Sequence, residues 1–386
     1  MGMKPHVLMM SQEVHPIPPV KGAAVEQWID AVAHRLTRYQ AHVASVPHPT
    51  RPDREADGEV HYCRIRIGRA YNRVFRKLTR LDPYSYIDRV VQYARSIQPA
   101  IVHIHNAPKF VLPVVRGVPG ARVILHMHNE KEGGIGARVA ALVGCSSYIC
   151  EWYRDRRVLA ERFTTLANGV DIAAYPRTRR TEEEKRALRV ECGVPADRLV
   201  VLYAGRISPE KGADRLVAAM RHLGRERFHL VLVGEWPGGD PRSSARARFA
   251  LDLTAQLRDV PHTLLGMAMP QDMARLYGLA DLLVIPSRFE EPFSMVAIEA
   301  MAAHVPVLAL RKGGMTEYMR DGENAVLVDG EATDEVLARA IGSAMQSPLK
   351  LEQQANSARE LVERRFDWQH IVADVERLYD DMLVKN

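Results

Sequence analysis

Short apolar segments of strand length alternate with segments of helical periodicity along the whole chain. In the first half, the apolar segments are rich in β-branched residues, and several are apolar at consecutive positions. Strands that are apolar on both faces are typical of parallel sheets covered by helices on both sides. We therefore expect strands at residues 6–11, 41–46, 100–106, 122–128 and 140–147. Helical periodicity lies between them at 23–36, 84–97 and 147–158.

The alternation is interrupted once, near the middle of the chain. Residues 171–187 are polar and charged, and they follow Asn168-Gly169, a dipeptide that favours turns. Strand-like segments then resume, and the chain ends in a helical run at 367–385. A length of 386 residues also favours two domains. We expect two parallel-sheet α/β domains, the second with strands at 199–205, 228–234, 262–266, 281–287, 305–310 and 325–328.

The composition is typical of a soluble globular protein, with 47% hydrophobic and 26% charged residues. No apolar run approaches the roughly 18–20 residues of a membrane span. The start of the chain has a short apolar run without a small-residue cleavage site, so we expect a first strand rather than a signal peptide. The four cysteines lack metal-binding spacing. We expect reduced thiols in a cytoplasmic protein.

Positive charge is concentrated in the first domain. Residues 1–170 contain 24 Lys and Arg against 14 Asp and Glu, and residues 64–80 contain seven cations and no acid. We interpret the 64–80 stretch as a solvated basic face. The alternative is a peripheral contact with anionic lipid on the inner face of the cell membrane, or with an anionic acceptor. No nucleic-acid-binding motif is present, so nucleic acid is not an expected partner.

The first candidate for chemistry is the segment AGRISPEKG, which directly follows an expected strand ending at Ala204. In parallel α/β sheets, ligands bind beyond the carboxyl ends of the strands. Arg206 and Lys211 lie there beside the start of the next helix, whose free N–H groups attract anions. The pattern indicates a site for a phosphate or diphosphate.

The second candidate is the segment EPFSMVAIEAMA, in which Glu291 and Glu299 are eight residues apart. It follows a strand and enters a helix, with Pro292 expected at or just before the first turn. Glu299 then lies on the same helix face as Met295 and is directed towards the helix start. We expect a nucleotide-sugar between the two acids: the diphosphate at the helix amides, Glu299 at the ribose, and Glu291 at the sugar.

These motifs resemble those of the retaining glycosyltransferase family 4, which includes glycogen-synthase-like, lipopolysaccharide, capsule and mannosyl transferases. The resemblance rests on Glu291-x7-Glu299, AGRISPEKG, LANGVD and a glycine-containing loop after the first strand, and it covers nearly the whole chain. It implies the GT-B fold: two facing Rossmann-like domains with a cleft between them and a C-terminal helix that crosses back. The implied boundaries are an acceptor-binding domain at 1–172 with 366–386, and a nucleotide-sugar-binding domain at 173–365.

The resemblance also implies roles for the residues that match its motifs. Those expected near the reaction are Glu291 at the transferred sugar, His128 close to the same sugar, and Arg206 and Lys211 on the donor diphosphate. Glu299 is expected at the ribose. Backbone groups expected to contact the donor belong to Gly22, Gly266, Met267, Phe293, Ser294 and Met295.

Two positions depart from the pattern of the family. The first loop is commonly Gly-Gly, but here it reads Lys21-Gly22-Ala23. Ser294 stands where the family commonly has glycine after Pro-Phe. A serine amide still donates a hydrogen bond, so donor binding is expected to persist while the selectivity for the donor sugar is left open.

His103 and His105, and likewise His126 and His128, are spaced to lie on one face of a strand. Such pairs occur in metal sites, but apart from Glu130 and Glu132 no nearby carboxylate is spaced to complete a ligand set. We therefore favour histidines of a polar cleft and expect no metal. No Asp-x-Asp motif follows a strand, and the cations of AGRISPEKG are expected to neutralise the diphosphate instead.

The expected function is that of a metal-independent retaining hexosyltransferase without a cofactor. Its donor is expected to be a UDP-sugar. The acceptor is a glycan, a glycolipid or a small molecule, and bacterial cell-surface polysaccharide synthesis is the expected setting. The alternatives are a GDP-sugar-dependent mannosyltransferase, a sugar-nucleotide epimerase on the same fold, and a non-catalytic coat protein that retains the fold.

Overall fold

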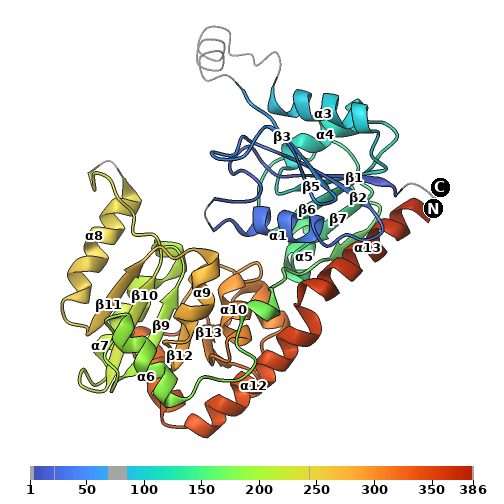
Figure 1. The fold of residues 1–386 in the computed structure, drawn as a ribbon. Helices are drawn as coiled ribbons and strands as arrows, with labels where there is room; N and C mark the ends of the chain where they lie inside the picture. Colours follow the sequence, from blue (N-terminus) through green and yellow to red (C-terminus); the bar gives the residue numbers. More distant parts are fainter. Residues whose placement is uncertain (1–3, 21, 68–84, 243, 385–386) are drawn as a thin grey trace. The chain divides into compact units, whose positions relative to one another are not determined.

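The computed structural model describes residues 4–20, 22–67, 85–242 and 244–384 (Figure 1). The chain forms two compact units. One comprises Met1–Gly169 together with Trp368–Asn386, and the other comprises Val170–Asp367. Most of the expected basic stretch, residues 68–80, lies outside the described residues.

The first unit contains a sheet that has eight strands in the described residues, in the order β3-β4-β2-β1-β5-β6-β7-β8. The strands are β1 (His6–Met10), β2 (Gln40–Ser45), β3 (Arg54–Asp57), β4 (Val60–Arg64), β5 (Ile101–His105), β6 (Arg122–Met127), β7 (Ala141–Gly144) and β8 (Phe163–Thr165). The predicted parallel pairing is confirmed from β2 to β7, and β4 and β8, which were not predicted, extend it in parallel.

The expectation of a wholly parallel sheet is wrong at one edge, where β3 pairs with β4 antiparallel. A two-residue turn through Gly58, whose φ is +57°, joins these strands, and so short a connection reverses the chain direction. Strand β3 was not predicted because three of its four residues are charged, so it lacks an apolar run.

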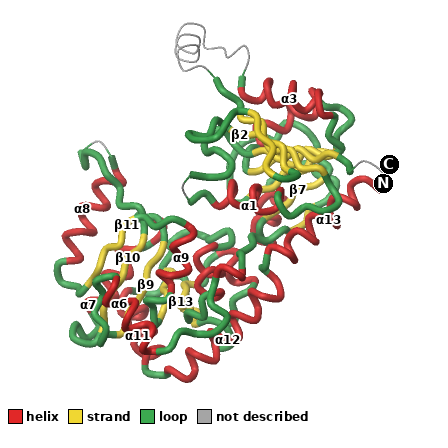
Figure 2. Tube along the Cα trace, viewed as in Figure 1, coloured by secondary structure: helices red, strands yellow, loops and turns green. Residues whose placement is uncertain are grey.

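Helices lie on both sides of the first sheet (Figure 2). They are α1 (Ala24–Ala33), α3 (Tyr86–Ile97), α4 (Val111–Gly117), α5 (Ser147–Asp155) and α13 (Trp368–Val384). Helices α1 and α13 share one core with the sheet, and the fully buried Trp28 and Tyr379 belong to it. The C-terminal helix therefore completes the first unit, although the whole of the second unit, Val170–Asp367, separates it in the sequence from the rest of that unit.

Gly169 permits the close approach of α13. A Cβ atom built on Gly169 would lie 2.4 Å from the ring of Trp368, the first residue of α13. The Asn168-Gly169 dipeptide, read from the sequence as a turn signal, thus also provides the space in which an aromatic ring packs.

The second unit contains a sheet with the order β11-β10-β9-β12-β13-β14 in the described residues, and all its pairs are parallel. The strands are β9 (Leu199–Ala204), β10 (Phe228–Val233), β11 (His262–Gly266), β12 (Leu282–Ile285), β13 (Val307–Leu310) and β14 (Val326–Val328). All six were predicted, because each is an apolar run bounded by polar or turn-forming residues.

The helices of the second unit precede, connect or follow the strands of its sheet (Figure 1). They are α6 (Glu182–Glu191), α7 (Ala213–Arg221), α8 (Ala245–Leu257), α9 (Pro270–Tyr277), α10 (Met295–Ala302), α11 (Asp334–Met345) and α12 (Pro348–Arg365). The apolar residues of α7, α8 and α11 form one core with the strands. Within the described residues, no helix combines the length and the apolar composition that crossing a membrane requires.

Glu376 of α13 fixes the segment that leads into β2. Its Oε1 accepts hydrogen bonds from the backbone N–H groups of Thr37 and Arg38 at 2.7 and 2.8 Å. Its Oε2 accepts a third from Arg38 Nε at 2.9 Å. The carboxylate is only 7% exposed. In a variant without this carboxylate, water therefore has poor access to the N–H donors that lose their acceptor.

We therefore expect Glu376→Ala to lower the free energy of unfolding by about 2–3 kcal/mol, the cost of leaving buried donors without an acceptor. The matched control is Asp374→Ala on the same helix. Asp374 and its partner Arg377 are 50% and 70% exposed, so the loss should stay below about 1 kcal/mol. Urea unfolding midpoints measure both. Equal losses in the two variants would contradict a specific role of Glu376.

Candidate active site

Two loops at the carboxyl ends of β9 and β12 are held against each other. The backbone N–H of Arg288 donates to the carbonyl of Glu210 at 2.9 Å, and the Arg288 guanidinium pairs with Asp214 at 2.6 Å. Gly212 has a φ of +71°, and a Cβ atom there would lie 2.0 Å from the Pro286 carbonyl oxygen. Only glycine fits this left-handed, crowded position. The loop that carries Lys211 is therefore seated against the loop that carries Glu291.

Lys211 and Glu291 form the ion pair at the centre of the site. The Nζ atom of Lys211 lies 2.8 and 3.1 Å from the two oxygens of Glu291. Ser287 Oγ donates a further hydrogen bond of 2.5 Å to Glu291, which is only 3% exposed. The Phe289 ring lies 4.6 Å from the same Nζ. Such a buried carboxylate requires a partner charge, and the fold supplies it from 80 residues away.

The helix that follows Glu291 begins later than the sequence suggested. Helix α10 starts at Met295, three residues after Pro292, because Ser294 adopts a φ of +75° that is incompatible with a right-handed helix. The hydroxyl of Tyr318 donates to the carbonyl of Phe293 at 2.6 Å and so holds this turn. Ser294 is at the N-cap position, where its side chain makes no capping hydrogen bond; Met295 is the first helical residue, and Phe293 lies outside the helix.

Glu299 lies one turn into α10 beside Tyr277, the last residue of α9. The Tyr277 hydroxyl donates to Glu299 Oε2 at 2.7 Å. Part of the Glu299 residue remains accessible, but dense protein surrounds the carboxyl group. This burial raises the pKa of Glu299 to about 7, although the bond from Tyr277 acts in the opposite direction. Nothing in the sequence around Tyr277 pointed to this contact.

The remaining donor-site candidates of this unit lie at the same edge of the sheet. Strand register places Val233 of β10 between Ala204 and Gly266, so the loops after β9 and β11 flank the end of β10. Arg206 follows Ala204, is 59% exposed, and lies 3.7 Å from Glu210. Gly266 and Met267 are exposed after β11, with Met267 at 45%.

Gly22 and His128 belong to the other unit. Gly22 is exposed and precedes α1, and a Cβ atom there would contact nothing within 4 Å. His128 directly follows β6, and its backbone N–H donates to Asn106 Oδ1 at 3.0 Å. Its Nε2 lies 3.2 Å from His105 Nδ1.

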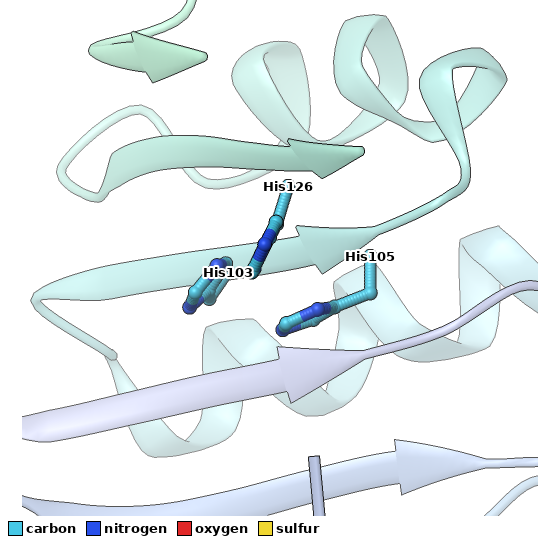
Figure 3. A group of neighbouring side chains, drawn as sticks. All are labelled: His103, His105 and His126. Carbon is cyan, nitrogen blue, oxygen red and sulfur yellow. The ribbon is translucent and has the colours of Figure 1, made fainter. Parts of the chain in front are cut away.

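Three histidines of the two expected pairs form one buried group (Figure 3), and the fourth, His128, lies beside it and is partly exposed. One ring nitrogen from each of His103, His105 and His126 lies within 4.8 Å of those of the other two, and these three side chains are fully buried. The indole ring of Trp28 lies 4.9 Å from both His105 and His126. His103 Nδ1 is 2.7 Å from the hydroxyl of Tyr379.

The geometry of this group is that of stacked rings. The His103 ring lies 29° from the plane of His105 and 15° from that of His126. Near-parallel rings direct their in-plane lone pairs alongside one another, whereas zinc ligands at 2.0–2.1 Å converge tetrahedrally with donor atoms about 3.4 Å apart. The expectation that no metal binds stays a prediction.

Burial keeps these histidines neutral. It lowers the pKa of His103 to about 3 and that of His128 to about 4. It also lowers the pKa values of His105 and His126 well below their usual range. Because a neutral imidazole carries no charge, it packs in the core without a carboxylate beside it to balance a charge.

The interpretation of residues 64–80 as a solvated basic face is wrong for its first member. Arg64 is only 2% exposed: its guanidinium donates to the carbonyls of Pro52 and Ile17 at 2.7 and 3.1 Å. It also pairs with Glu55 at 2.7 Å. Arg66 is exposed and pairs with Asp53 at 3.0 Å.

Comparison with known proteins places the chain in a family. The model of the family described as Glycosyl transferases group 1 matches residues 184–361. A lipopolysaccharide 1,2-N-acetylglucosaminetransferase of Salmonella typhimurium is 31% identical over 372 residues, which cover 93% of this chain and 94% of that protein. The chain belongs to the group 1 glycosyl transferases. Arg206, Lys211, Gly266, Glu291 and Glu299 all lie within the matched range.

Two solved structures share the fold of this glycosyltransferase. A sucrose-phosphate synthase from Thermosynechococcus elongatus aligns with a TM-score of 0.78 at 22% identity, covering 99% of this chain and 100% of that one. The Anabaena protein HepE in complex with UDP-glucose aligns with a TM-score of 0.74 at 21% identity, covering 98% and 100%. The enzyme therefore has the GT-B fold expected from its sequence, built from two parallel-sheet α/β units.

The buried histidines predict how the stability of the glycosyltransferase depends on pH. Unfolded histidines bind protons below about pH 6.5, whereas the folded ones do so only near pH 3–4. Stability is thus fully present above pH 6.5 and is lost as the pH falls below it, by up to about 1.4 kcal/mol per pH unit for each histidine.

Urea unfolding between pH 7 and pH 5 measures this loss. His103→Gln should make the decline shallower by about one proton, while His370→Gln, at an exposed position on α13, should leave it unchanged. An identical decline in the wild type and in His103→Gln would contradict the neutral state of His103.

Proposed function

We propose that the enzyme is a retaining, metal-independent transferase of family 4 that uses a UDP-sugar donor. Its acceptor is a glycan or lipid-linked saccharide of bacterial cell-surface polysaccharide synthesis. The observation that carries the proposal is the Lys211–Glu291 pair at the carboxyl edge of the second sheet, 2.8 Å apart, with the start of α10 beside it. The lipopolysaccharide transferase relative and the UDP-glucose complex of HepE support the acceptor class and the nucleotide.

The charges of the site suit a diphosphate next to a neutral sugar. Arg206 is exposed and Lys211 is 24% exposed, so both cations are accessible to a ligand. The N–H groups at the start of α10 add positive potential at the same edge. Glu291 balances one cation when the site has no ligand. On binding, the diphosphate takes over part of the interaction with Lys211, and Glu291 turns its acceptor capacity to sugar hydroxyls.

The proposed chemistry follows from these charges. The bond between the anomeric carbon and the diphosphate oxygen breaks, and an acceptor oxygen bonds to the same face of that carbon. The acceptor proton passes to the departing phosphate oxygen. Arg206, Lys211 and the helix amides stabilise the negative charge that develops on the diphosphate, which is usually the largest catalytic term. Glu291 is held by Lys211 and Ser287, which suits a positioning role better than that of a nucleophile.

The function is tested by comparing nucleotide-sugars of UDP, GDP, ADP and dTDP in thermal unfolding. A ligand that binds only the folded protein raises the melting temperature, and at equal concentration a tighter ligand raises it more. UDP-sugars should give the largest shift, and turnover of the preferred donor should persist in excess EDTA. A larger shift with a GDP-sugar would favour the mannosyltransferase alternative, and interconversion of donor sugars without an acceptor would favour an epimerase.

Substitution of Glu299 and of Glu291 should impair different properties, UDP affinity in the first case and sugar transfer in the second. Glu299→Ala should weaken the affinity for UDP by roughly 5- to 150-fold, because about 1–3 kcal/mol is lost when a buried hydrogen-bonding partner is removed. Glu291→Ala should leave UDP affinity undiminished while transfer falls. Calorimetric titration with UDP measures the difference. Loss of UDP binding in Glu291→Ala alone would show that the nucleotide lies the other way along α10.

The same titrations should depend on pH in the wild type. The ionised form of Glu299 accepts the most ribose hydrogen bonds, and its pKa is about 7, so UDP affinity should fall as the pH drops from 8 to 6. Tyr277→Phe removes a bond that lowers this pKa, and the decline should therefore shift to higher pH. A flat profile in both proteins would contradict the ribose assignment of Glu299.

A further inference from the structure

A pocket of about 630 Å³ lies in the first unit, between the segment after β6 and the end of α5. Its volume is that of sites that hold small ligands. The residues on which the following argument rests are Gly133, Gly134, Trp152, Arg156 and Arg157. None of them belongs to the expected donor site.

The wall of the pocket is fixed at its two ends. The backbone N–H of Lys131 donates to the hydroxyl of Tyr153 on α5 at 3.1 Å. Lys131 Nζ donates to Gln12 Oε1 at 3.1 Å and to the Asn106 carbonyl at 3.0 Å, so it ties the segment to the carboxyl ends of β1 and β5. Ile135 is 93% buried at the other end. The segment that forms this wall of the pocket is thus held in place at both ends.

Gly133 and Gly134 expose their backbone between these anchors. Gly133 has a φ of +128°, and no atom lies within 4 Å of a Cβ built at either position. Both residues are exposed, and in the part of the chain that the structure describes neither amide has a hydrogen-bond acceptor. Consecutive free N–H groups on a fixed segment are suited to an anion or to sugar hydroxyls.

The opposite side of the pocket carries two adjacent cations. Arg157 is exposed, has a φ of +54°, and pairs with no acid among the described residues. The Arg156 guanidinium lies 3.5 Å from the centre of the Trp152 ring and donates to the Trp152 carbonyl at 3.2 Å. The acid that lines the pocket is Glu132, so positive charge prevails. Arginine binds phosphate through paired N–H donors, and an indole ring offers an apolar face for a sugar.

We propose that this pocket binds a phosphate-bearing saccharide, as part of the acceptor of the transfer reaction. The phosphate meets Arg157 and the amides of Gly133 and Gly134, and the sugar ring contacts Trp152. The substrate class rests on the proposed function, but binding at the pocket is independent of the donor and is measured separately.

The probe is glucose 6-phosphate, compared with glucose and with inorganic phosphate, in ligand-observed NMR titrations of the full-length enzyme. Glucose 6-phosphate should bind, and the other two should bind at least about ten-fold more weakly, because each makes only one of the two kinds of contact. Equal binding of inorganic phosphate would overturn the saccharide part of the proposal. Displacement of glucose 6-phosphate by UDP would place the signal at the donor site and overturn the proposal.

Arg157→Ala should weaken glucose 6-phosphate binding by about ten-fold or more, since a bidentate charged contact is lost. Arg154→Ala is the matched control: Arg154 is exposed near the end of α5, three residues before Arg157, lies 5.0 Å from the Phe163 ring, and does not line the pocket. It should bind as the wild type does. Equal affinity in all three proteins would overturn the proposal. Failure of every nucleotide-sugar to bind would reject the proposed donor without changing this result.

Discussion

The second unit depends on burying the carboxylate of Glu291 at the edge of its sheet. An unpaired buried carboxylate is costly, and this one is stabilised only because Lys211 and Ser287 both reach it. Because both groups must reach the carboxylate, the loops after β9 and β12 have to lie at one relative position. Gly212 and the Arg288–Asp214 pair serve the same arrangement, since they hold the two loops at the separation that the ion pair needs.

This ion pair also links stability to the proposed catalysis. In the unliganded protein Lys211 neutralises Glu291, whereas in the proposed donor complex it neutralises the departing diphosphate. The carboxylate then has a free oxygen for the sugar. Lys211 therefore has an anionic partner both without and with the donor. This balance of charge limits the free-energy cost of burying the site. Glu299 differs, because its partner is the neutral Tyr277 and burial leaves its pKa near 7.

In the first unit, by contrast, the polar groups at the centre of the sheet are buried in an uncharged form. His103 and His105 of β5 and His126 of β6 are buried next to Trp28, and their neutral form removes the need for counter-ions. Tyr379 of the C-terminal helix contacts this group through His103. The helix thereby completes both the apolar core and the polar cluster. The pocket beside α5 adds positive charge to the same unit at a separate place, suited to an anionic partner of the reaction.

The sequence alone determined the two sheets, because most of their strands are contiguous apolar runs whose burial is a local property. It also determined Glu291, Glu299, Arg206 and Lys211 as residues of one sheet edge, because all of them follow strands or begin the next helix. It missed β3, β4 and β8, the first two of which carry polar or charged residues.

Only the tertiary structure decided which partner each polar group meets. The pairing of Lys211 with Glu291, the contact of Tyr277 with Glu299 and the burial of Arg64 among carbonyl groups join residues that are between 12 and 80 positions apart. The late start of α10 depends on a serine in a backbone conformation that its residue type disfavours. Local conformational preferences depend on residues that are neighbours in the sequence. The free energy of burying a charge depends instead on the groups that lie beside it in the completed fold.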